Sequence, residues 1–236
     1  MPQTPYDLII FDCDGTLVDS EYLNCLSCSE IIREAGFDGY TVDYIYNEMV
    51  GMTLVDIRAA IEQKHGRKLP DDLRDRIIKR ISQNAPTHLR RIDGALRMVS
   101  WADENGFPLC VASNGERPNV LESLRIAELD TYLPPERTFT ADQDEVAKGK
   151  PAPDLFLYAA SQTGGHDPAR CLVIEDTTVG VRAAKAAGMT VFGLTSSHAN
   201  IPGYDDRLRE AGADAIMESW ADFPAQIKDA QIKGSA

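Results

Sequence analysis

Five short apolar runs, most of them ending in polar residues, recur along the chain. They are YDLIIFD at 6–12, FPLCVAS at 107–113, RTFTA at 137–141, CLVIED at 171–176 and TVFGLT at 190–195. Continuous apolar runs of this length are typical of strands that are buried on both faces of a parallel sheet. We therefore predict five strands, and a short apolar stretch at 214–217 follows the last of them.

Helical spacing of apolar residues fills most of the intervals between these runs. Helices are expected at 95–105, 117–127, 154–162, 178–187 and 205–211, with a last one from about 219. Strands that alternate with helices indicate a parallel sheet covered on both faces. The predicted fold class is therefore α/β, with a Rossmann-like doubly wound parallel sheet as its core.

The segment between the first two predicted strands has a different pattern, because it contains helices and no clear strand. These helices are expected at 20–35, at 41–51, after the capping box formed by Thr53 and Asp56, and after Pro70. A helical insertion of this size suggests a second domain. We predict a core domain of residues 1–17 and 92–236, and an inserted helical cap domain of residues 18–91.

Composition narrows the classes of partner. The 236 residues carry a formal net charge of −13, with 43% apolar and 26% charged residues. Such an acidic surface disfavours nucleic acid and anionic membranes as partners. The N-terminus does not resemble a signal peptide, and no run reaches the length of a membrane span. We expect a cytoplasmic monomer.

Cysteines and histidines add no predicted site of their own. Cys25 and Cys28 form a CxxC inside a predicted helix, without a second CxxC or a histidine pair, so a zinc or redox site is disfavoured. The four histidines show no ligand spacing, and we expect them at surface or cap positions: His65, His88, His166 and His198.

Polar residues that follow the predicted strands carry the candidate chemistry. Ligands bind at the carboxyl ends of strands in doubly wound sheets, so residues at these ends should share one edge. They are Asp12, Asp14, Thr16, Ser113, Asn114, Glu175 and Asp176, together with Lys150 from a loop that leads into a helix. Clustered carboxylates repel one another unless a cation joins them, and their hard oxygen ligands suit Mg²⁺.

This inventory suits phosphoryl transfer. A carboxylate can attack phosphorus and form an acyl phosphate, while a second carboxylate donates a proton to the leaving oxygen. A lysine and a hydroxyl can stabilise the equatorial oxygens, and a metal can neutralise the phosphate charge. The partner expected from this chemistry is a small phosphorylated metabolite.

The four segments FDCDGTLVDS, ASNG, GKPAPD and VIEDT, in this order, resemble the four motifs of the haloacid dehalogenase (HAD) superfamily. The resemblance covers nearly the whole chain, including a helical cap between the first two motifs. It is similar to the subgroup that holds β-phosphoglucomutase, phosphoglycolate phosphatase and 6-phosphogluconate phosphatase. It implies a Mg²⁺-dependent phosphatase that acts on a sugar phosphate or sugar-acid phosphate.

The resemblance also implies a role for each motif residue. Asp12 is the nucleophile, Asp14 the general acid and base, and Ser113 and Lys150 hold the phosphoryl group. Thr16, Asn114 and Gly115 are expected on the substrate side of the site. The metal ligands implied are Asp12, Asp14 through its main-chain carbonyl, Glu175 and Asp176.

Two alternatives remain open. A sugar phosphomutase of the β-phosphoglucomutase type would carry cations on both sides of the cap glycine, Gly51, where this chain has Val50 and Leu54. A non-catalytic binding module usually lacks one of the catalytic groups, and none is missing here. Arg58, Arg90 and Arg91 could meet a substrate carboxylate, although solvated surface positions are expected for them.

Overall fold

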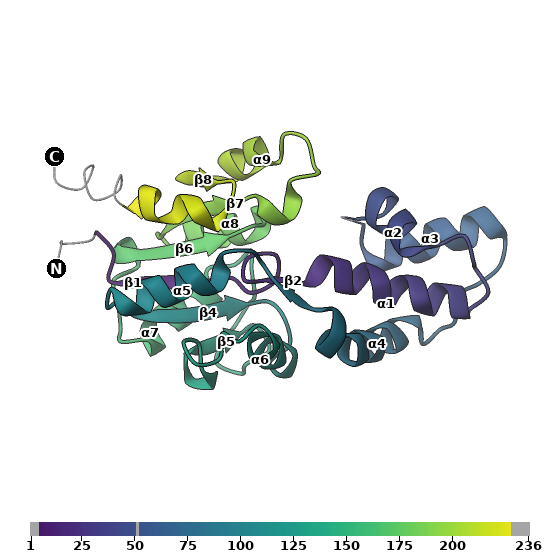
Figure 1. Cartoon of the computed structure of the whole chain (residues 1–236), viewed down its shortest axis with the longest axis horizontal. Coiled ribbons are helices and arrows are strands. Elements are labelled where there is room, and N and C mark those ends of the chain that lie inside the picture. The colour runs from purple at the N-terminus through teal and green to yellow at the C-terminus, as the bar shows by residue number, and fades with distance from the viewer. Residues whose placement is uncertain (1–4, 51, 228–236) are drawn as a thin grey trace. The chain divides into compact units, whose positions relative to one another are not determined.

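Six parallel strands build the central sheet of the computed structural model, which describes residues 5–50 and 52–227 (Figure 1). Their order across the sheet is β5-β4-β1-β6-β7-β8. The strands are β1 (Leu8–Phe11), β4 (Leu109–Ser113), β5 (Thr138–Thr140), β6 (Cys171–Glu175), β7 (Thr190–Leu194) and β8 (Ala215–Met217). The α/β class is confirmed, and the apolar stretch at 214–217 supplies the sixth strand.

Five helices connect these strands. They are α5 (Ala95–Glu104), α6 (Arg117–Ile126), α7 (Asp154–Gln162), α8 (Thr178–Ala186) and α9 (Tyr204–Ala211). Short 3-10 turns are η1 (Pro135–Arg137), η2 (Pro168–Arg170), η3 (Ser196–His198) and η4 (Trp220–Asp222). Pro at the start of α6 fits the first turn of a helix, where its missing N–H has no partner to lose.

Alternate residues of each strand bury different faces of the sheet. Leu8 and Ile10 of β1 pack in one cluster with Phe156 of α7, Val181 of α8 and Leu208 of α9. These three helices therefore cover one face. Phe11, the β1 residue after Ile10, points to the other face and contacts Trp220 with ring centroids 5.8 Å apart, so the η4 turn lies on that opposite face.

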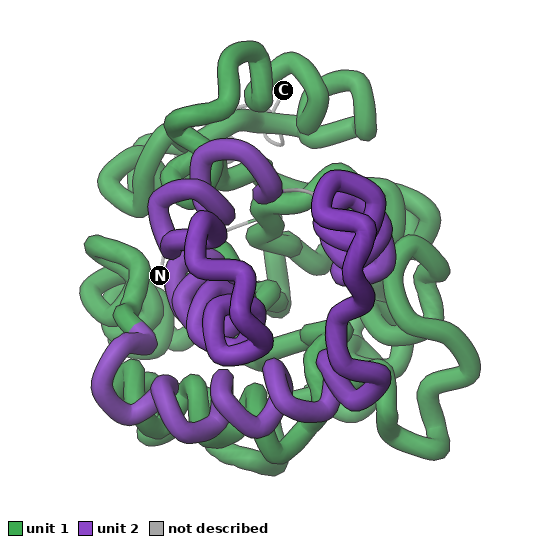
Figure 2. The backbone as a smooth tube through the Cα atoms, turned by 90° about the vertical axis from the view of Figure 1, so that its right-hand side faces the viewer, with its two compact units in different colours: residues 1–19, 90–236 green, residues 20–89 purple. Residues whose placement is uncertain are grey.

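The chain divides into two compact units, Met1–Asp19 with Arg90–Ala236, and Ser20–Leu89 (Figure 2). The second unit contains α1 (Ser20–Glu34), α2 (Val42–Glu48), α3 (Leu54–His65) and α4 (Leu73–His88). It has a core of its own, which includes Ile32 of α1, Ile45 of α2, Ile61 of α3 and Leu73 of α4. Thr53 caps α3 by accepting a hydrogen bond from the Asp56 N–H, as the capping box predicts.

A short antiparallel ribbon corrects the expectation that no strand lies between residues 18 and 90. Strand β2 (Val18–Asp19) pairs with β3 (Arg90–Arg91). Each strand has two residues, too few for a period-two pattern to appear in the sequence. The ribbon joins the two points at which the chain leaves and re-enters the sheet-bearing unit.

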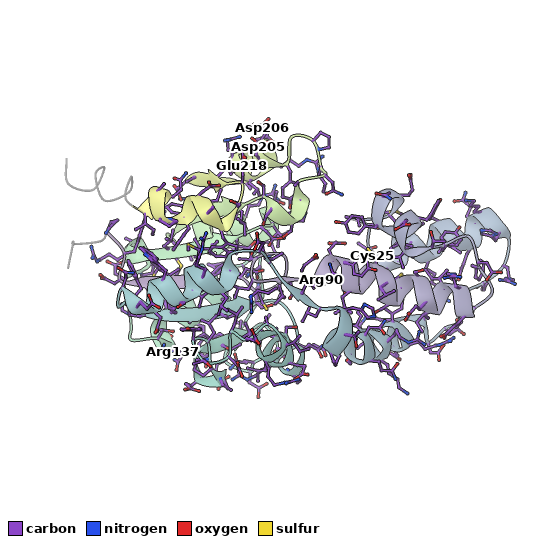
Figure 3. All side chains as sticks on the ribbon, in the orientation of Figure 1. Cys25, Arg90, Arg137, Asp205, Asp206 and Glu218 are labelled. Atoms are coloured by element: carbon purple, nitrogen blue, oxygen red, sulfur yellow. The ribbon has the colours of Figure 1, made fainter. Side chains whose placement is uncertain are left out.

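The CxxC pair belongs to the packing of the helical unit. Cys25 lies on α1 (Figure 3), and its thiol donates to the carboxylate of Glu21. Both Cys25 and Cys28 are buried free thiols, and burial raises the pKa of Cys28 to about 11. Such thiols are apolar core groups at neutral pH. Among the described residues, none of the helices combines the length and apolar character that a membrane span requires.

Candidate active site

The loop after β1 carries the first motif and is fixed by backbone hydrogen bonds. Asp12 follows the last residue of β1 and is buried. The N–H groups of Gly15 and Leu17 donate to the carbonyls of Val18 and Cys13, each at 2.8 Å. Gly15 has a φ of +79°, and a Cβ there would lie 2.0 Å from the Asp176 carboxylate, so this position requires glycine.

Lys150 joins two of the buried carboxylates. Its Nζ lies 2.5 Å from Asp12 Oδ1 and 2.8 Å from Glu175 Oε1. The Asn114 side chain holds the Lys150 backbone, because Oδ1 accepts from the lysine N–H and Nδ2 donates to its carbonyl. Lys148, the other lysine of the third motif, is exposed. The structure therefore brings Lys150, and not Lys148, into the cluster.

Glu175 is held at the start of α8. Its Oε2 accepts from the N–H and the hydroxyl of Thr177, at 2.7 and 2.9 Å, and its Oε1 accepts from Lys150. Thr177 in turn caps α8 by accepting from the Gly180 N–H. A Cβ on Gly180 would lie 1.6 Å from Glu175 Oε1, so the helix approaches the carboxylate as closely as a glycine allows.

Asp176 receives hydrogen bonds from segments that are distant in sequence. The Thr16 hydroxyl donates to its Oδ1 at 3.2 Å, and His198 Nε2 lies 2.9 Å from its Oδ2. The Tyr204 hydroxyl donates to its main-chain carbonyl at 3.0 Å. His198 therefore corrects the expectation of a surface or cap histidine, and its side chain is only 14% exposed.

The strand-end rule could have found His198, because the residue follows the end of β7 as Asp12 follows the end of β1. It lies four positions beyond the end of the strand, and no second histidine is near it in the sequence, so the usual signal is missing. Thr16 is fully buried and its hydroxyl donates to Asp176, and its place on the substrate side stays a prediction.

The second motif lines the remaining side of the cluster. Ser113 ends β4, is buried, and accepts a hydrogen bond from the Gly115 N–H. Asp14 is exposed, and its Oδ2 would lie 3.5 Å from a Cβ on Gly115. Asp14 and Ser113 are thus neighbours at the carboxyl edge, one reaching toward solvent and the other buried.

The cluster buries three carboxyl groups but only one ammonium group. Burial raises the pKa of Asp12 well above its ordinary value, although the Lys150 ammonium acts in the opposite sense. Burial and the Glu175 charge likewise raise the pKa of Asp176, while Thr16 and Lys150 oppose the rise. Burial alone would lower the pKa of Lys150, but the charges of Asp12 and Glu175 outweigh it and raise that pKa.

A divalent cation fits this arrangement. Asp12, Glu175 and Asp176 each offer a carboxylate oxygen, and these oxygens lie within 4.8 Å of one another. One ammonium faces three carboxylates, so a cation would supply the missing positive charge. Glu175 has three hydrogen-bonding contacts, from Lys150 and the two Thr177 donors, whereas Asp176 has two and Asp12 has one.

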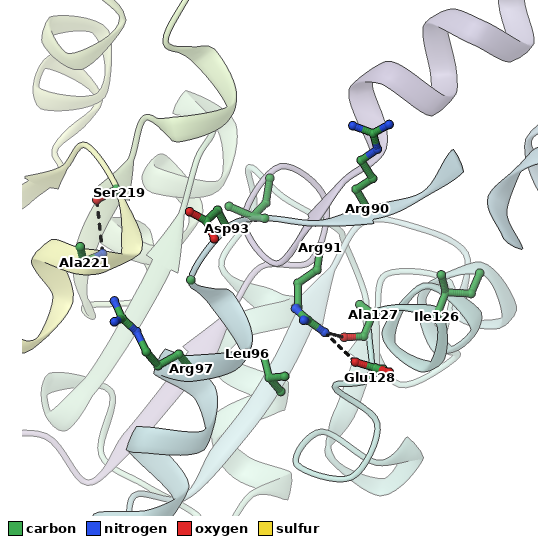
Figure 4. Close-up of a pocket in the computed structure, with 12 residues that line it drawn as sticks. Arg90, Arg91, Asp93, Leu96, Arg97, Ile126, Ala127, Glu128, Ser219 and Ala221 are labelled. Atoms are coloured by element: carbon green, nitrogen blue, oxygen red, sulfur yellow. Dashed lines mark hydrogen bonds and ion pairs between the residues drawn. The ribbon is translucent and has the colours of Figure 1, made fainter. Parts of the chain in front are cut away.

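A hollow of about 900 Å³ lies beside the start of α5. Figure 4 shows Arg91 donating to the Ala127 carbonyl and to Glu128. Arg58, in the helical unit, is likewise paired with Glu62. Solvated surface positions are expected for Arg58, Arg90 and Arg91; Arg90 is exposed, whereas Arg58 and Arg91 are partly buried and paired with these partners.

The fold and the cluster define the class of protein. Residues 9–194 match the model of the haloacid dehalogenase-like hydrolase family, which is most of the chain. The chain therefore belongs to this family, as its four motifs predict. The expected enzyme class, a phosphoric monoester hydrolase, is confirmed.

Particular relatives show how widely the resemblance extends. The chain is 29% identical to the bifunctional riboflavin kinase/FMN phosphatase of Arabidopsis thaliana over 92% of its own length, but spans only 56% of that relative. It is 26% identical to the 6-phosphogluconate phosphatase of Escherichia coli, covering 83% of this chain and 86% of the relative. A HAD family hydrolase of Deinococcus radiodurans, solved with bound phosphate and sodium, superimposes with a TM-score of 0.78 and 30% identity over 97% of each chain.

Proposed function

We propose that this chain is a Mg²⁺-dependent phosphatase that hydrolyses a small phosphorylated metabolite through a phosphoryl-aspartate on Asp12. The observation that carries the proposal is the Lys150 ammonium, which touches Asp12 and Glu175 beside the buried Asp176. A buried lysine in this position both orients the nucleophile and stabilises negative charge that develops on a transferring phosphoryl group.

Two in-line displacements account for the reaction. In the first, an Asp12 oxygen forms a bond to phosphorus while the ester P–O bond breaks, and Asp14 donates a proton to the leaving oxygen. In the second, Asp14 takes a proton from water, and the water oxygen forms a bond to phosphorus while the bond between phosphorus and the Asp12 oxygen breaks. Inorganic phosphate leaves and the Asp12 carboxylate is regenerated. The exposure of Asp14 suits a group that exchanges protons with leaving group and water.

The remaining residues bind and orient. The Ser113 hydroxyl, at the end of β4, can donate to a phosphoryl oxygen, and Asn114 keeps Lys150 in place through its two backbone hydrogen bonds. The ligands proposed for Mg²⁺ are the carboxylates of Asp12 and Asp176 and the main-chain carbonyl of Asp14, with Glu175 in support. When bound, Mg²⁺ would neutralise phosphate charge and stabilise the ionised state of the buried carboxylates.

We assign the substrate-selecting role to the helical unit, as a cap, and a sugar phosphate or sugar-acid phosphate as the substrate class. The 6-phosphogluconate phosphatase and the (DL)-glycerol-3-phosphatases among the relatives support a small polar substrate. The mutase alternative is disfavoured, because a mutase would carry cations where this chain has Val50 and Leu54. These two apolar side chains line a pocket of about 290 Å³ within the helical unit. Gly51, between them, lies outside the described residues.

Hydrolysis of p-nitrophenyl phosphate tests the reaction. The wild type should release p-nitrophenol with Mg²⁺, and Asp12→Asn should lose this activity while remaining folded. Asp130→Asn, which changes an exposed acid remote from the motifs, is the matched control and should behave as the wild type. Turnover by Asp12→Asn at the wild-type rate would refute the nucleophile, and inactivity of the wild type would favour a binding module.

A panel of phosphorylated metabolites then addresses the substrate class. Free phosphate measured from sugar phosphates and sugar-acid phosphates should exceed that from nucleotides. Glucose 1-phosphate provides the comparison with a mutase, because a phosphatase releases phosphate whereas a mutase yields glucose 6-phosphate. Formation of glucose 6-phosphate without phosphate release would establish the alternative.

A further inference from the structure

The loop that follows β7 reaches Asp176 with a histidine that none of the four motifs contains. His198 ends the η3 turn, and its Nε2 lies 2.9 Å from Asp176 Oδ2. In the ionised state that a cation requires, the Asp176 carboxylate only accepts hydrogen bonds, so the histidine Nε2 is the donor in that state. The Asp176 side chain is 3% exposed, which makes the contact one between nearly desolvated groups.

Tyr204, at the start of α9, supports the same residue from a second direction. Its hydroxyl donates to the Asp176 main-chain carbonyl at 3.0 Å. Its ring packs on the His198 ring with centroids 4.1 Å apart and an interplanar angle of 32°. The tyrosine thus limits the rotation of both the imidazole and the aspartate backbone.

The Asp176 side chain is therefore fixed at both of its oxygens. Thr16 donates to Oδ1 and His198 donates to Oδ2, while Tyr204 holds the backbone. The same loop is also tied to the nucleophile loop, because the Ser197 hydroxyl donates to the Gly15 carbonyl. Few rotamers of Asp176 remain compatible with all of these contacts.

We propose that His198 and Tyr204 are positioning residues that pre-orient the Asp176 carboxylate for a divalent cation. The inference rests on the proposed metal-dependent function, but it concerns cation affinity rather than turnover. Hydrogen-bond partners of a metal ligand fix its orientation, and their loss costs roughly 10- to 100-fold in metal affinity. A carboxylate oxygen can accept a hydrogen bond and still coordinate a cation, because each oxygen has two lone-pair sites.

Isothermal titration with Mg²⁺ tests this on the full-length chain. His198→Leu should raise the Mg²⁺ dissociation constant roughly 10- to 100-fold. His198→Gln should restore most of the affinity, because its side-chain amide can place a donor near the position of Nε2. Tyr204→Phe keeps the ring and removes one hydrogen bond, so we expect a loss of roughly 2- to 10-fold.

His166→Leu is the matched control, since His166 lies in the loop between α7 and β6 and touches none of the motif residues in the described structure. It should bind Mg²⁺ as the wild type does. Wild-type affinity in His198→Leu, or equal losses in His198→Leu and His198→Gln, would overturn the proposal. Normal Mg²⁺ binding without phosphatase activity in the wild type would instead refute the proposed function and leave the positioning role intact.

Discussion

At the scale of single residues, Lys150 supplies the positive charge that offsets the carboxylates of Asp12 and Glu175. It is the partner of two buried carboxylates, and its side chain is only 3% exposed. Removing one member of a buried ion pair leaves the other charge uncompensated, which typically costs about 3–5 kcal/mol. Lys150→Met should lower the free energy of unfolding by that amount.

Lys148→Met is the control for this change, because Lys148 lies two residues away and is exposed. It should change the stability by no more than about 0.5 kcal/mol. Urea unfolding of both variants without Mg²⁺ provides the measurement. Equal stability of the two variants would show that Lys150 does not compensate the charges of Asp12 and Glu175.

The ionised Asp176 carboxylate, which the proposed metal site requires, should destabilise the metal-free protein. Its pKa is raised by burial and by Glu175, so the folded state binds a proton that the unfolded state has lost. This contribution is fully present below the ordinary aspartate pKa and is lost as the pH rises through the raised value. Asp176→Asn should therefore raise the melting temperature of the metal-free protein, more at pH 8 than at pH 4.

Melting curves recorded in EDTA across this pH range provide the test. The same variant should lose the stabilisation that Mg²⁺ gives to the wild type, because one proposed ligand is gone. A melting temperature below that of the wild type at pH 8 would contradict the argument.

The sequence locates the residues that come together but not every contact among them. Asp12, Ser113 and Asp176 each follow a predicted strand, and parallel strands bring such residues to one edge. The catalytic and metal-binding roles of the motif residues stay predictions. The contacts of His198 and Tyr204 with Asp176 were not predicted. A single histidine in a loop and a single tyrosine at the start of a helix belong to no motif with a recognisable spacing.

At the scale of elements, the start of α8 approaches the site so closely that only glycine fits at position 180. In an open helix Gly→Ala stabilises by roughly 1 kcal/mol. Gly180→Ala should instead destabilise the protein, because the new Cβ meets Glu175 Oε1 at 1.6 Å and must displace it from Lys150.

Gly39→Ala, where no atom lies within 4 Å of an added Cβ, is the matched control and should be neutral or mildly stabilising. Thermal unfolding of both variants measures the difference. A Gly180→Ala protein as stable as the wild type would mean that α8 can shift away from Glu175 at little cost.

Elements were predictable where hydrophobic pattern and turn chemistry agreed. The helix over 154–162 matches α7, and the strand at 171–176 matches β6 within one residue. The β2–β3 ribbon was not predictable, because its pairing joins residues about 70 positions apart in strands of two residues. Its side chains, including Arg90 and Arg91, carry no alternation that distinguishes strand from loop.

At the scale of the whole molecule, each of the two units has its own hydrophobic core. The net charge of −13 makes a locally positive group necessary wherever a phosphate is to bind. The sheet-bearing unit supplies one through Lys150 and gathers all the motif residues. The helical unit contributes none of the proposed catalytic groups, so its stability can vary without altering the chemistry of the cluster directly.

This separation predicts that a core mutation in the helical unit acts locally. Ile61 of α3 is fully buried, and Ile61→Ala should cost the unit about 2–5 kcal/mol. Val55 of the same helix is 75% exposed, so Val55→Ala should change stability by no more than about 0.5 kcal/mol. Native-state hydrogen exchange resolves the two units, because it reports local opening free energies.

In Ile61→Ala, amides of α1, α3 and α4 should exchange faster, while those of β1 and β6 keep their wild-type protection because they belong to the other core. The sheet-bearing unit should also retain its Mg²⁺ affinity, since Asp12, Glu175 and Asp176 all lie in it. Equal loss of protection in β1 and in α3 would mean that the chain unfolds as one cooperative body. The helical insertion would then contribute to the stability of the acidic cluster as well as to the proposed selection of substrate.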